Sequence, residues 1–119
     1  MKAIEIKQDV FWVGAIDWGV RDFHGYVTPK GTTYNNYLIV DEQITLIDTV
    51  KHNFHEITVD NIKSVVDPAK ITTLVINHIE PDHASSIDKI MGLAPNATIY
   101  ISERGKKGLD RYFDTSKWK

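Results

Sequence analysis

Over the first part of the chain, apolar and polar residues alternate in short stretches, which is the pattern of β-strands with one buried face. The second stretch is the strongest, because it is rich in aromatic and β-branched residues. The last two stretches are separated by the polar residues 41–43, which favours a hairpin connection. The pattern predicts four strands, at residues 3–7, 10–14, 34–40 and 44–47.

Residues 17–30, between the second and third predicted strands, favour a loop. This stretch ends in the turn signal Thr28-Pro29-Lys30-Gly31. It contains three side chains considered again below, Trp18, His24 and Tyr26.

Apolar residues take up helical spacing from Phe54 onward. One helix is predicted over 54–66, ended by Asp67-Pro68 because a residue before proline avoids the α region. A second is predicted over 87–94, and a third begins after Ser102 as N-cap and carries Leu109, Tyr112 and Phe113. Strands are predicted between these helices, at 71–77 and 97–101.

The order of elements, strands first and then alternating helices and strands, indicates an α/β layered fold with helices on the outer face of a sheet. The strand at 71–77 is apolar on both faces, so we expect it to be a central strand covered on each side.

Composition narrows the class of protein. The 119 residues fit one domain, and 14 basic against 16 acidic residues give a net charge of −2, which offers no reason to expect a nucleic-acid partner. The absence of cysteine excludes thiolate metal sites and a cysteine nucleophile. Early charges and the lack of a long apolar run predict no secretory signal and no membrane span, and hence a cytoplasmic protein.

The chemically informative stretch is Asn77-His78-Ile79-Glu80-Pro81-Asp82-His83, directly after the strand at 71–77. His78 and Glu80 point to one side of an extended segment, and Asp82 continues that parity. Ligands of α/β folds gather at the carboxyl ends of strands. Two imidazoles and two carboxylates form a nitrogen and oxygen donor set that suits iron, manganese or zinc, and carboxylates can bridge two cations.

A single histidine beside a carboxylate is more often a surface hydrogen-bonding pair than a metal ligand. Four such residues so close together after an apolar strand are poorly explained as a solvated loop. We therefore predict a metal site formed by His78, Glu80, Asp82 and His83.

This spacing resembles the H-x-H-x-D-H motif of the metallo-β-lactamase superfamily, with Glu80 in place of the second histidine. That replacement, together with four further segments, resembles the N-terminal part of flavodiiron proteins, also called A-type flavoproteins or rubredoxin:oxygen oxidoreductases. The segments are GAIDW at 14–18, RDFHGY at 21–26, GTTYNNYL at 31–38 and LIDTVK at 46–51.

The resemblance implies a fold and a set of roles. The fold would be the N-terminal half of a metallo-β-lactamase-like αββα sandwich holding a non-haem diiron site. His78 and Glu80 would ligate one iron, and Asp82 and His83 the other.

Other residues would lie beside the metals. His24 would be either a near-site residue or a hydrogen-bonding loop residue, and Asp48 a supporting residue rather than a ligand. Tyr26 and Trp18 would be walls of the site or simple packing aromatics. His52 and His55 match no motif and are expected to be solvated at a helix start.

The family's chemistry would be reduction of O₂ to water or of NO to N₂O. Electrons would reach the diiron pair from FMN in a flavodoxin-like domain of the other subunit of a homodimer. The electron donor would be rubredoxin, or a reductase linked to coenzyme F420 or NADH.

The chain departs from this pattern in length. The family's remaining ligands are two histidines and a bridging aspartate, and residues 84–119 contain no histidine. We therefore expect residues 1–119 to be a partial β-lactamase-like domain, without its C-terminal half or an FMN domain, and inactive alone.

Three alternatives stay open at this point. The chain could be a short half-domain that completes its metal site by dimerisation or with a partner chain. It could be a non-catalytic scaffold. It could also be a metallo-β-lactamase-type hydrolase, although Glu80 disfavours this because the hydrolases prefer histidine there for zinc.

Overall fold

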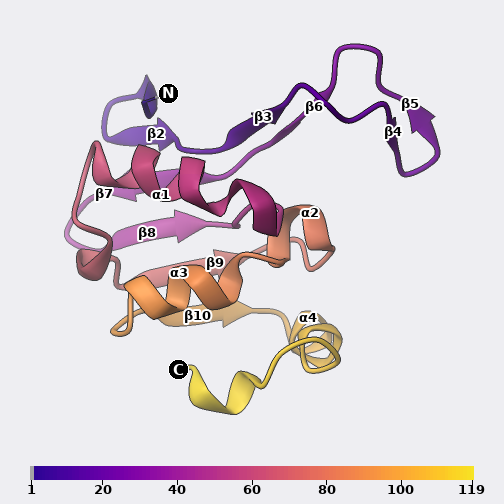
Figure 1. The fold of residues 1–119 in the computed structure, drawn as a ribbon. Coiled ribbons are helices and arrows are strands. Elements are labelled where there is room, and N and C mark those ends of the chain that lie inside the picture. Colours follow the sequence, from indigo (N-terminus) through magenta and orange to yellow (C-terminus); the bar gives the residue numbers. More distant parts are fainter. Residues whose placement is uncertain (1) are drawn as a thin grey trace.

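The computed structural model describes residues 2–119, and its centre is a six-stranded mixed sheet (Figure 1). The first four strands in the sheet are antiparallel, and the last three run parallel to one another, β8 being common to both groups. All six strands were predicted from the apolar pattern. In spatial order they are β1 (Ile4–Lys7), β2 (Val10–Trp12), β7 (Tyr37–Val40), β8 (Ile44–Ile47), β9 (Thr73–Ile76) and β10 (Thr98–Ile101).

Helices α1 (His55–Lys63) and α3 (Ile87–Leu93) cover one face of this sheet, as Figure 1 shows. Their apolar stripes meet the central strands in a single core. The side chains at its centre are fully buried, so the predicted layering of helices on a sheet is confirmed. They include Leu38, Leu46, Leu74, Ile62 and Ile87.

The opposite face of the sheet carries a row of side chains that runs across all six strands. Directly paired residues lie on the same side of a sheet, and the pairing registers place Ile4, Trp12, Tyr37, Ile47, Val75 and Tyr100 in one line. Along β9 burial alternates between full and partial. The prediction that the strand at 71–77 is covered on both faces is therefore wrong for the described residues 2–119, because helices pack on one face only.

Residues 15–34 form a projecting segment, called the arm below (Figure 1). Its base is a ladder of β3 (Ala15–Asp17) and β6 (Thr32–Tyr34), and its tip is a hairpin of β4 (Asp22–Phe23) and β5 (Tyr26–Val27). The expected loop at 17–30 is thus partly a hairpin. Its turn places His24 (φ 50°) and Gly25 (φ 79°) in the left-handed region, as a two-residue hairpin turn requires.

Two helix boundaries differ from prediction. The helix expected over 54–66 begins at His55, after a short 3₁₀ turn, η1 (His52–Phe54), and stops at Lys63. The C-terminal helix α4 (Glu103–Leu109) has the predicted cap, since Ser102 Oγ accepts a hydrogen bond from Gly105 N at 3.0 Å. It ends before Tyr112, which is exposed.

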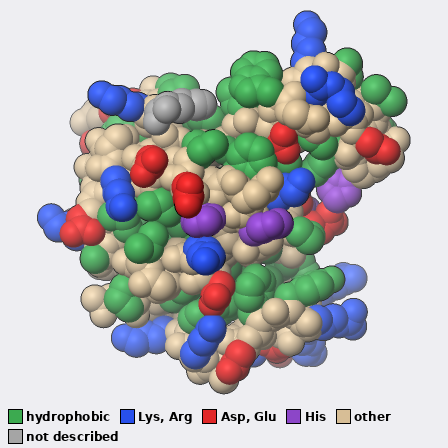
Figure 2. All heavy atoms as spheres, in the orientation of Figure 1, with side chains coloured by type: hydrophobic (Ala, Val, Ile, Leu, Met, Phe, Trp, Pro, Cys, Tyr) green, Lys and Arg blue, Asp and Glu red, His purple; other side chains and the backbone are tan. Residues whose placement is uncertain are grey.

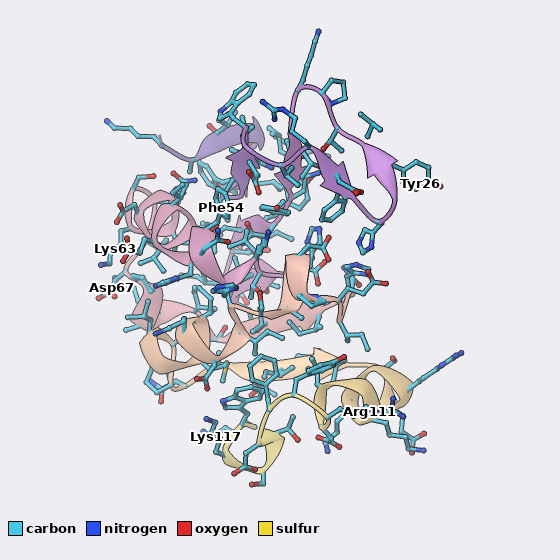
Figure 3. The ribbon with its side chains drawn as sticks, turned by 45° about the vertical axis from the view of Figure 1, so that its right-hand side comes forward. Tyr26, Phe54, Lys63, Asp67, Arg111 and Lys117 are labelled. Carbon is cyan, nitrogen blue, oxygen red and sulfur yellow. The ribbon has the colours of Figure 1, made fainter. Side chains whose placement is uncertain are left out.

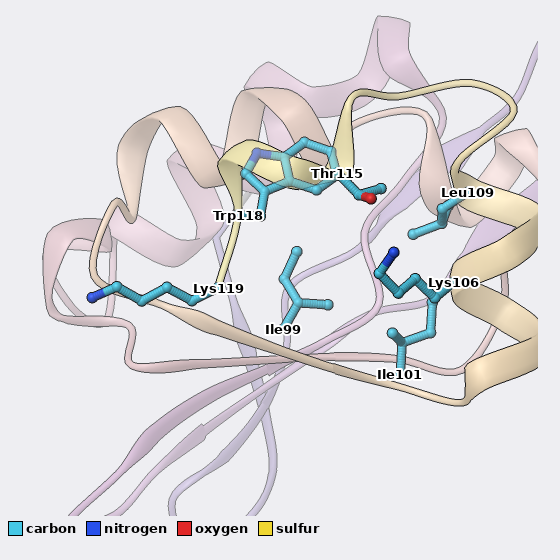
Figure 4. Close-up of a pocket in the computed structure, with 7 residues that line it drawn as sticks. All are labelled: Ile99, Ile101, Lys106, Leu109, Thr115, Trp118 and Lys119. Carbon is cyan, nitrogen blue, oxygen red and sulfur yellow. The ribbon is translucent and has the colours of Figure 1, made fainter.

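The remaining short elements lie at the ends of the main ones. They are the 3₁₀ turn η2 (Pro68–Lys70), helix α2 (Pro81–Ala84) and the 3₁₀ turn η3 (Thr115–Lys117). The C-terminal segment lies over β10, where Ile99 N donates to Lys119 O at 2.8 Å. Trp118 lines one side of a small apolar cavity of about 110 Å³ there (Figure 4). Within residues 2–119, no helix has the length and apolar character needed to cross a bilayer.

Candidate metal centre

Five side chains meet at the carboxyl end of β9, below the arm. They are called the site cluster here and comprise His24, His78, Glu80, Asp82 and His83. In the space-filling view, histidine and acidic side chains lie next to one another below the projecting arm (Figure 2).

Four members of the site cluster come from one local stretch. Residues 77–79 lie between the end of β9 and the start of α2 and have no regular structure. Glu80 is extended (φ −70°, ψ 155°), and Pro81 then occupies the first turn of α2, where its missing N–H is no loss. This strand-to-helix corner turns Asp82 and His83 back toward His78.

The contacts form a continuous set. Asp82 lies between two imidazoles, with Oδ1 3.5 Å from His78 Nε2 and Oδ2 3.5 Å from His83 Nε2. Glu80 Oε2 lies 3.8 Å from His78 Nε2 and 3.1 Å from His24 Nε2. One ligand atom each from His24, Glu80 and Asp82 fall within 4.8 Å of one another, a spacing compatible with a shared metal ion.

Two polar atoms of the site cluster are buried and have no hydrogen-bond partner among the described residues. The side chains of Asp82 and His83 are only 10% and 18% exposed. Within the described residues, Asp82 Oδ1 and His83 Nδ1 are buried and accept or donate no hydrogen bond. Buried polar atoms without partners are uncommon and call for an explanation such as a bound ion. The residues present therefore fit a cation with nitrogen and oxygen ligands, such as iron, manganese or zinc.

Asp48 supports the site cluster from the end of β8. Its Oδ1 accepts hydrogen bonds from Asn77 N at 2.7 Å and from His78 N at 3.2 Å. Asp48 has a left-handed backbone (φ 59°) and donates its own N–H to Val75 O. It thus fixes the backbone that carries His78 through hydrogen bonds to main-chain atoms, and its role as a supporting residue of a metal site stays a prediction.

His24 contacts the Glu80 carboxylate, and the sequence alone could not establish this contact. Its contact with Glu80 joins positions 56 residues apart in the chain, and the arm brings it there. Trp18 and Tyr26 are 68% and 76% exposed, so neither is buried against the rest of the described residues, and their interpretation as packing aromatics stays a prediction. Tyr26 points away from the body of the molecule at the tip of the arm (Figure 3). A role as walls of the site stays a prediction.

The two other histidines lie outside the site cluster. His52 is exposed in η1, and His55 begins α1, where its Nδ1 lies 2.7 Å from His52 O. Both are at the helix start, as expected, and His55 is only half-buried.

The family comparison rests on most of the chain. A family model described as "ODP family beta lactamase" matches residues 32–118. The rubredoxin-oxygen oxidoreductase of Megalodesulfovibrio gigas is 44% identical over 119 residues, which covers 99% of this chain and 30% of that protein. The nitric oxide reductase of Moorella thermoacetica is 42% identical over 112 residues, covering 92% of this chain and 28% of that protein.

A solved structure shows the same fold. The crystal structure of the flavodiiron protein from Giardia intestinalis superposes with a TM-score of 0.93 and 38% identity, covering 99% of this chain and 29% of that one. This confirms the predicted fold class, the N-terminal half of a metallo-β-lactamase-like αββα sandwich. The chain spans about 30% of the length of the relatives that it matches.

Proposed function

Because the chain belongs to the ODP beta-lactamase family, as its match over residues 32–118 shows, we propose that it supplies ligands of a non-haem diiron centre at which O₂ or NO is reduced. The observation that carries this proposal is the convergence of His24, His78, Glu80, Asp82 and His83, with buried donor atoms left unpaired. The relatives' names, a rubredoxin-oxygen oxidoreductase and a nitric oxide reductase, supply the reaction class.

We assign the ligands in two pairs. His78 and Glu80 would hold one iron, and Asp82 and His83 the second, as the family resemblance implies; Asp82 contacts both imidazoles at 3.5 Å and so lies between the two pairs. Two ferrous ions held there would provide the binding position for a diatomic gas and two of the electrons for its reduction, and an external donor would supply the rest. The carboxylates would offset the cations' charge, and Asp48 keeps the His78 backbone in place.

The chain's own donors are few for two ions. Four side chains shared by two irons give each ion two protein ligands, whereas metals of this type bind four to six donors. We therefore propose that residues 1–119 act as part of a larger β-lactamase-like assembly and reduce little gas by themselves. FMN and a rubredoxin-type or reductase donor would belong to that assembly, and we assign no FMN contact to this chain.

Anaerobic iron loading tests the proposal. We expect the purified chain to retain Fe²⁺ after desalting, and the Glu80→Gln variant to retain less because one charged ligand is lost. His55→Gln is the matched control, since His55 lies outside the site cluster. Absence of iron in the unmodified chain would favour the non-catalytic scaffold. Two tightly held irons, together with consumption of O₂ or NO in the presence of a reductant, would contradict the proposal that this chain has too few ligands for two irons.

A second candidate is a half-domain that completes its site by associating with another copy or a partner chain. The observation that favours it is the apolar row on the uncovered sheet face, whose end members Ile4 and Tyr100 are 53% and 59% exposed. Exposed apolar patches of this kind mark association surfaces. Light scattering with and without Fe²⁺ tests it: a metal-dependent increase in mass supports this candidate, and a monomer under both conditions rejects it.

A further inference from the structure

The arm contains a buried hydrogen-bonded pair that lies outside the site cluster. Asp17, at the end of β3, is 8% exposed, and Tyr34, at the end of β6, is fully buried. The Tyr34 hydroxyl donates a hydrogen bond to Asp17 Oδ2 at 2.7 Å. This contact joins the two strands at the base of the arm.

Asp17 also fixes the backbone of residues 19 and 20, which lead to the tip of the arm. Its other oxygen, Oδ1, accepts hydrogen bonds from Gly19 N and Val20 N, both at 3.1 Å. Val20 O in turn accepts from Thr28 Oγ1 at 2.9 Å, which ties the outgoing strand of the arm to the returning one. The hairpin that carries His24 lies directly between Val20 and Thr28 in the chain.

Tyr34 reaches the same hairpin through its ring. The ring packs against Phe54, at a centroid distance of 5.3 Å, and against Phe23, at 6.3 Å. Phe23 stacks edge-on with His24 at 4.3 Å. A continuous set of contacts therefore runs from the Asp17–Tyr34 pair to the imidazole that meets Glu80.

The protonation states of the two residues preserve their hydrogen bond, because Tyr34 stays protonated and Asp17 stays ionised. Burial raises the pKa of Tyr34, and the neighbouring Asp17 and Asp82 raise it further, so the hydroxyl stays a donor. Burial alone would raise the pKa of Asp17, but the hydrogen bonds from Tyr34, Gly19 and Val20 outweigh it and the pKa falls below its usual range. Asp17 is therefore a charged acceptor at neutral pH.

We propose that Asp17 and Tyr34 are positioning residues that hold His24 against Glu80 and thereby strengthen cation binding by the site cluster. This inference rests on the proposed function, because it concerns the same site. Its physical basis is that residues supporting a ligand group commonly change metal affinity without touching the metal.

The test compares Tyr34→Phe, which keeps the ring and removes the hydroxyl, with Tyr112→Phe, a matched change at an exposed position after α4. The first measurement needs no metal: a nuclear Overhauser contact between the His24 imidazole and the Glu80 side chain. We expect this contact in the unmodified chain and in Tyr112→Phe, and its loss or marked weakening in Tyr34→Phe.

The second measurement is calorimetric Zn²⁺ affinity in a double-mutant cycle with His24→Ala. We expect Tyr34→Phe to weaken Zn²⁺ binding by about tenfold in the unmodified background. In the His24→Ala background the same change should have almost no effect, because Tyr34 acts through His24. A purely structural role would lower the melting temperature in both backgrounds and leave the cycle additive.

Three results would overturn the inference: an unchanged His24–Glu80 contact in Tyr34→Phe, unchanged Zn²⁺ affinity, or an equal loss of affinity in both backgrounds. If the unmodified chain binds no Zn²⁺, the proposed function fails, and the metal-free contact alone decides whether the pair positions His24. If Tyr34→Phe does not fold, Asp17→Asn is measured in the same way.

Discussion

Asp48 is the residue whose replacement tests most sharply how the site is held. It combines a left-handed backbone (φ 59°) with a buried carboxylate that accepts hydrogen bonds from Asn77 N and His78 N. Asp48→Ala removes Oδ1, the acceptor of both hydrogen bonds, and leaves two backbone N–H groups without that partner. Asp48→Gly also removes this acceptor but adopts the left-handed backbone without strain. Asp48→Asn keeps an acceptor oxygen and loses only the charge.

The expected magnitudes follow from these contacts. Hydrogen bonds to a charged group contribute about 1.5–3 kcal/mol each, so the loss of both costs about 3–6 kcal/mol of unfolding free energy. A left-handed backbone costs alanine about 1 kcal/mol more than glycine. Neutral hydrogen bonds are roughly half as strong as charged ones, so Asp48→Asn should cost about 1.5–3 kcal/mol. At about 4 °C per kcal/mol, the melting temperature should fall by roughly 12–24 °C for Asp48→Ala and 6–12 °C for Asp48→Asn.

Circular dichroism melts and urea titrations of the three variants measure these values. The expected order of stability is the unmodified chain, then Asp48→Asn, then Asp48→Gly, then Asp48→Ala. Stability of Asp48→Gly equal to that of the unmodified chain would refute the reasoning, because the two hydrogen bonds would then contribute only about the 1 kcal/mol of backbone strain that glycine relieves. Equal stability of the Asn and Ala variants would also refute it.

Three further predictions concern other parts of the chain. Gly31→Ala should destabilise the fold by more than about 2 kcal/mol, because its new Cβ would lie 2.0 Å from Asp17 O at a φ of 79°. Gly25→Ala has the same φ and nothing within 4 Å of its new Cβ, so it should cost only about 1 kcal/mol. Urea titrations compare the two variants. The lowered pKa of Asp17 means that its carboxylate stabilises the fold above the ordinary aspartate pKa. This stabilisation is lost as the pH falls through the pKa of Asp17 in the folded chain. Asp17→Asn should therefore flatten the acid limb of a curve of unfolding free energy against pH. Zn²⁺ at about 100 times its dissociation constant should stabilise the unmodified chain by about 2.7 kcal/mol in thermal melts, and the gain should shrink in Glu80→Gln.

Local side-chain patterns were enough to predict most of the fold. The six strands of the sheet and the helix at 87–93 follow from period-2 and period-3.6 spacing within a few residues. The helix end at Lys63 was missed because Val65 and Val66 continue the apolar spacing. They pack against the core from a turn, which periodicity cannot distinguish from a helix.

The site was predictable to the extent that it is local. His78, Glu80, Asp82 and His83 lie within one strand-to-helix corner, so their convergence follows from chain direction. The place of His24 does not, because it depends on a hairpin whose strands have two residues each and on packing between Phe23 and Tyr34. The His24-Gly25 pair was the available signal, since a glycine after a residue that tolerates positive φ favours a tight hairpin.

The most direct test of the metal site uses the five histidines as internal probes. Imidazole resonances are followed by nuclear magnetic resonance while Zn²⁺ is added to the unmodified chain. The account predicts that the His78 and His83 signals shift together and saturate, and that the signals of His52 and His55 stay in place. Unchanged His78 and His83 signals, or equal shifts of all five, would contradict the assignment of this cluster as a metal centre.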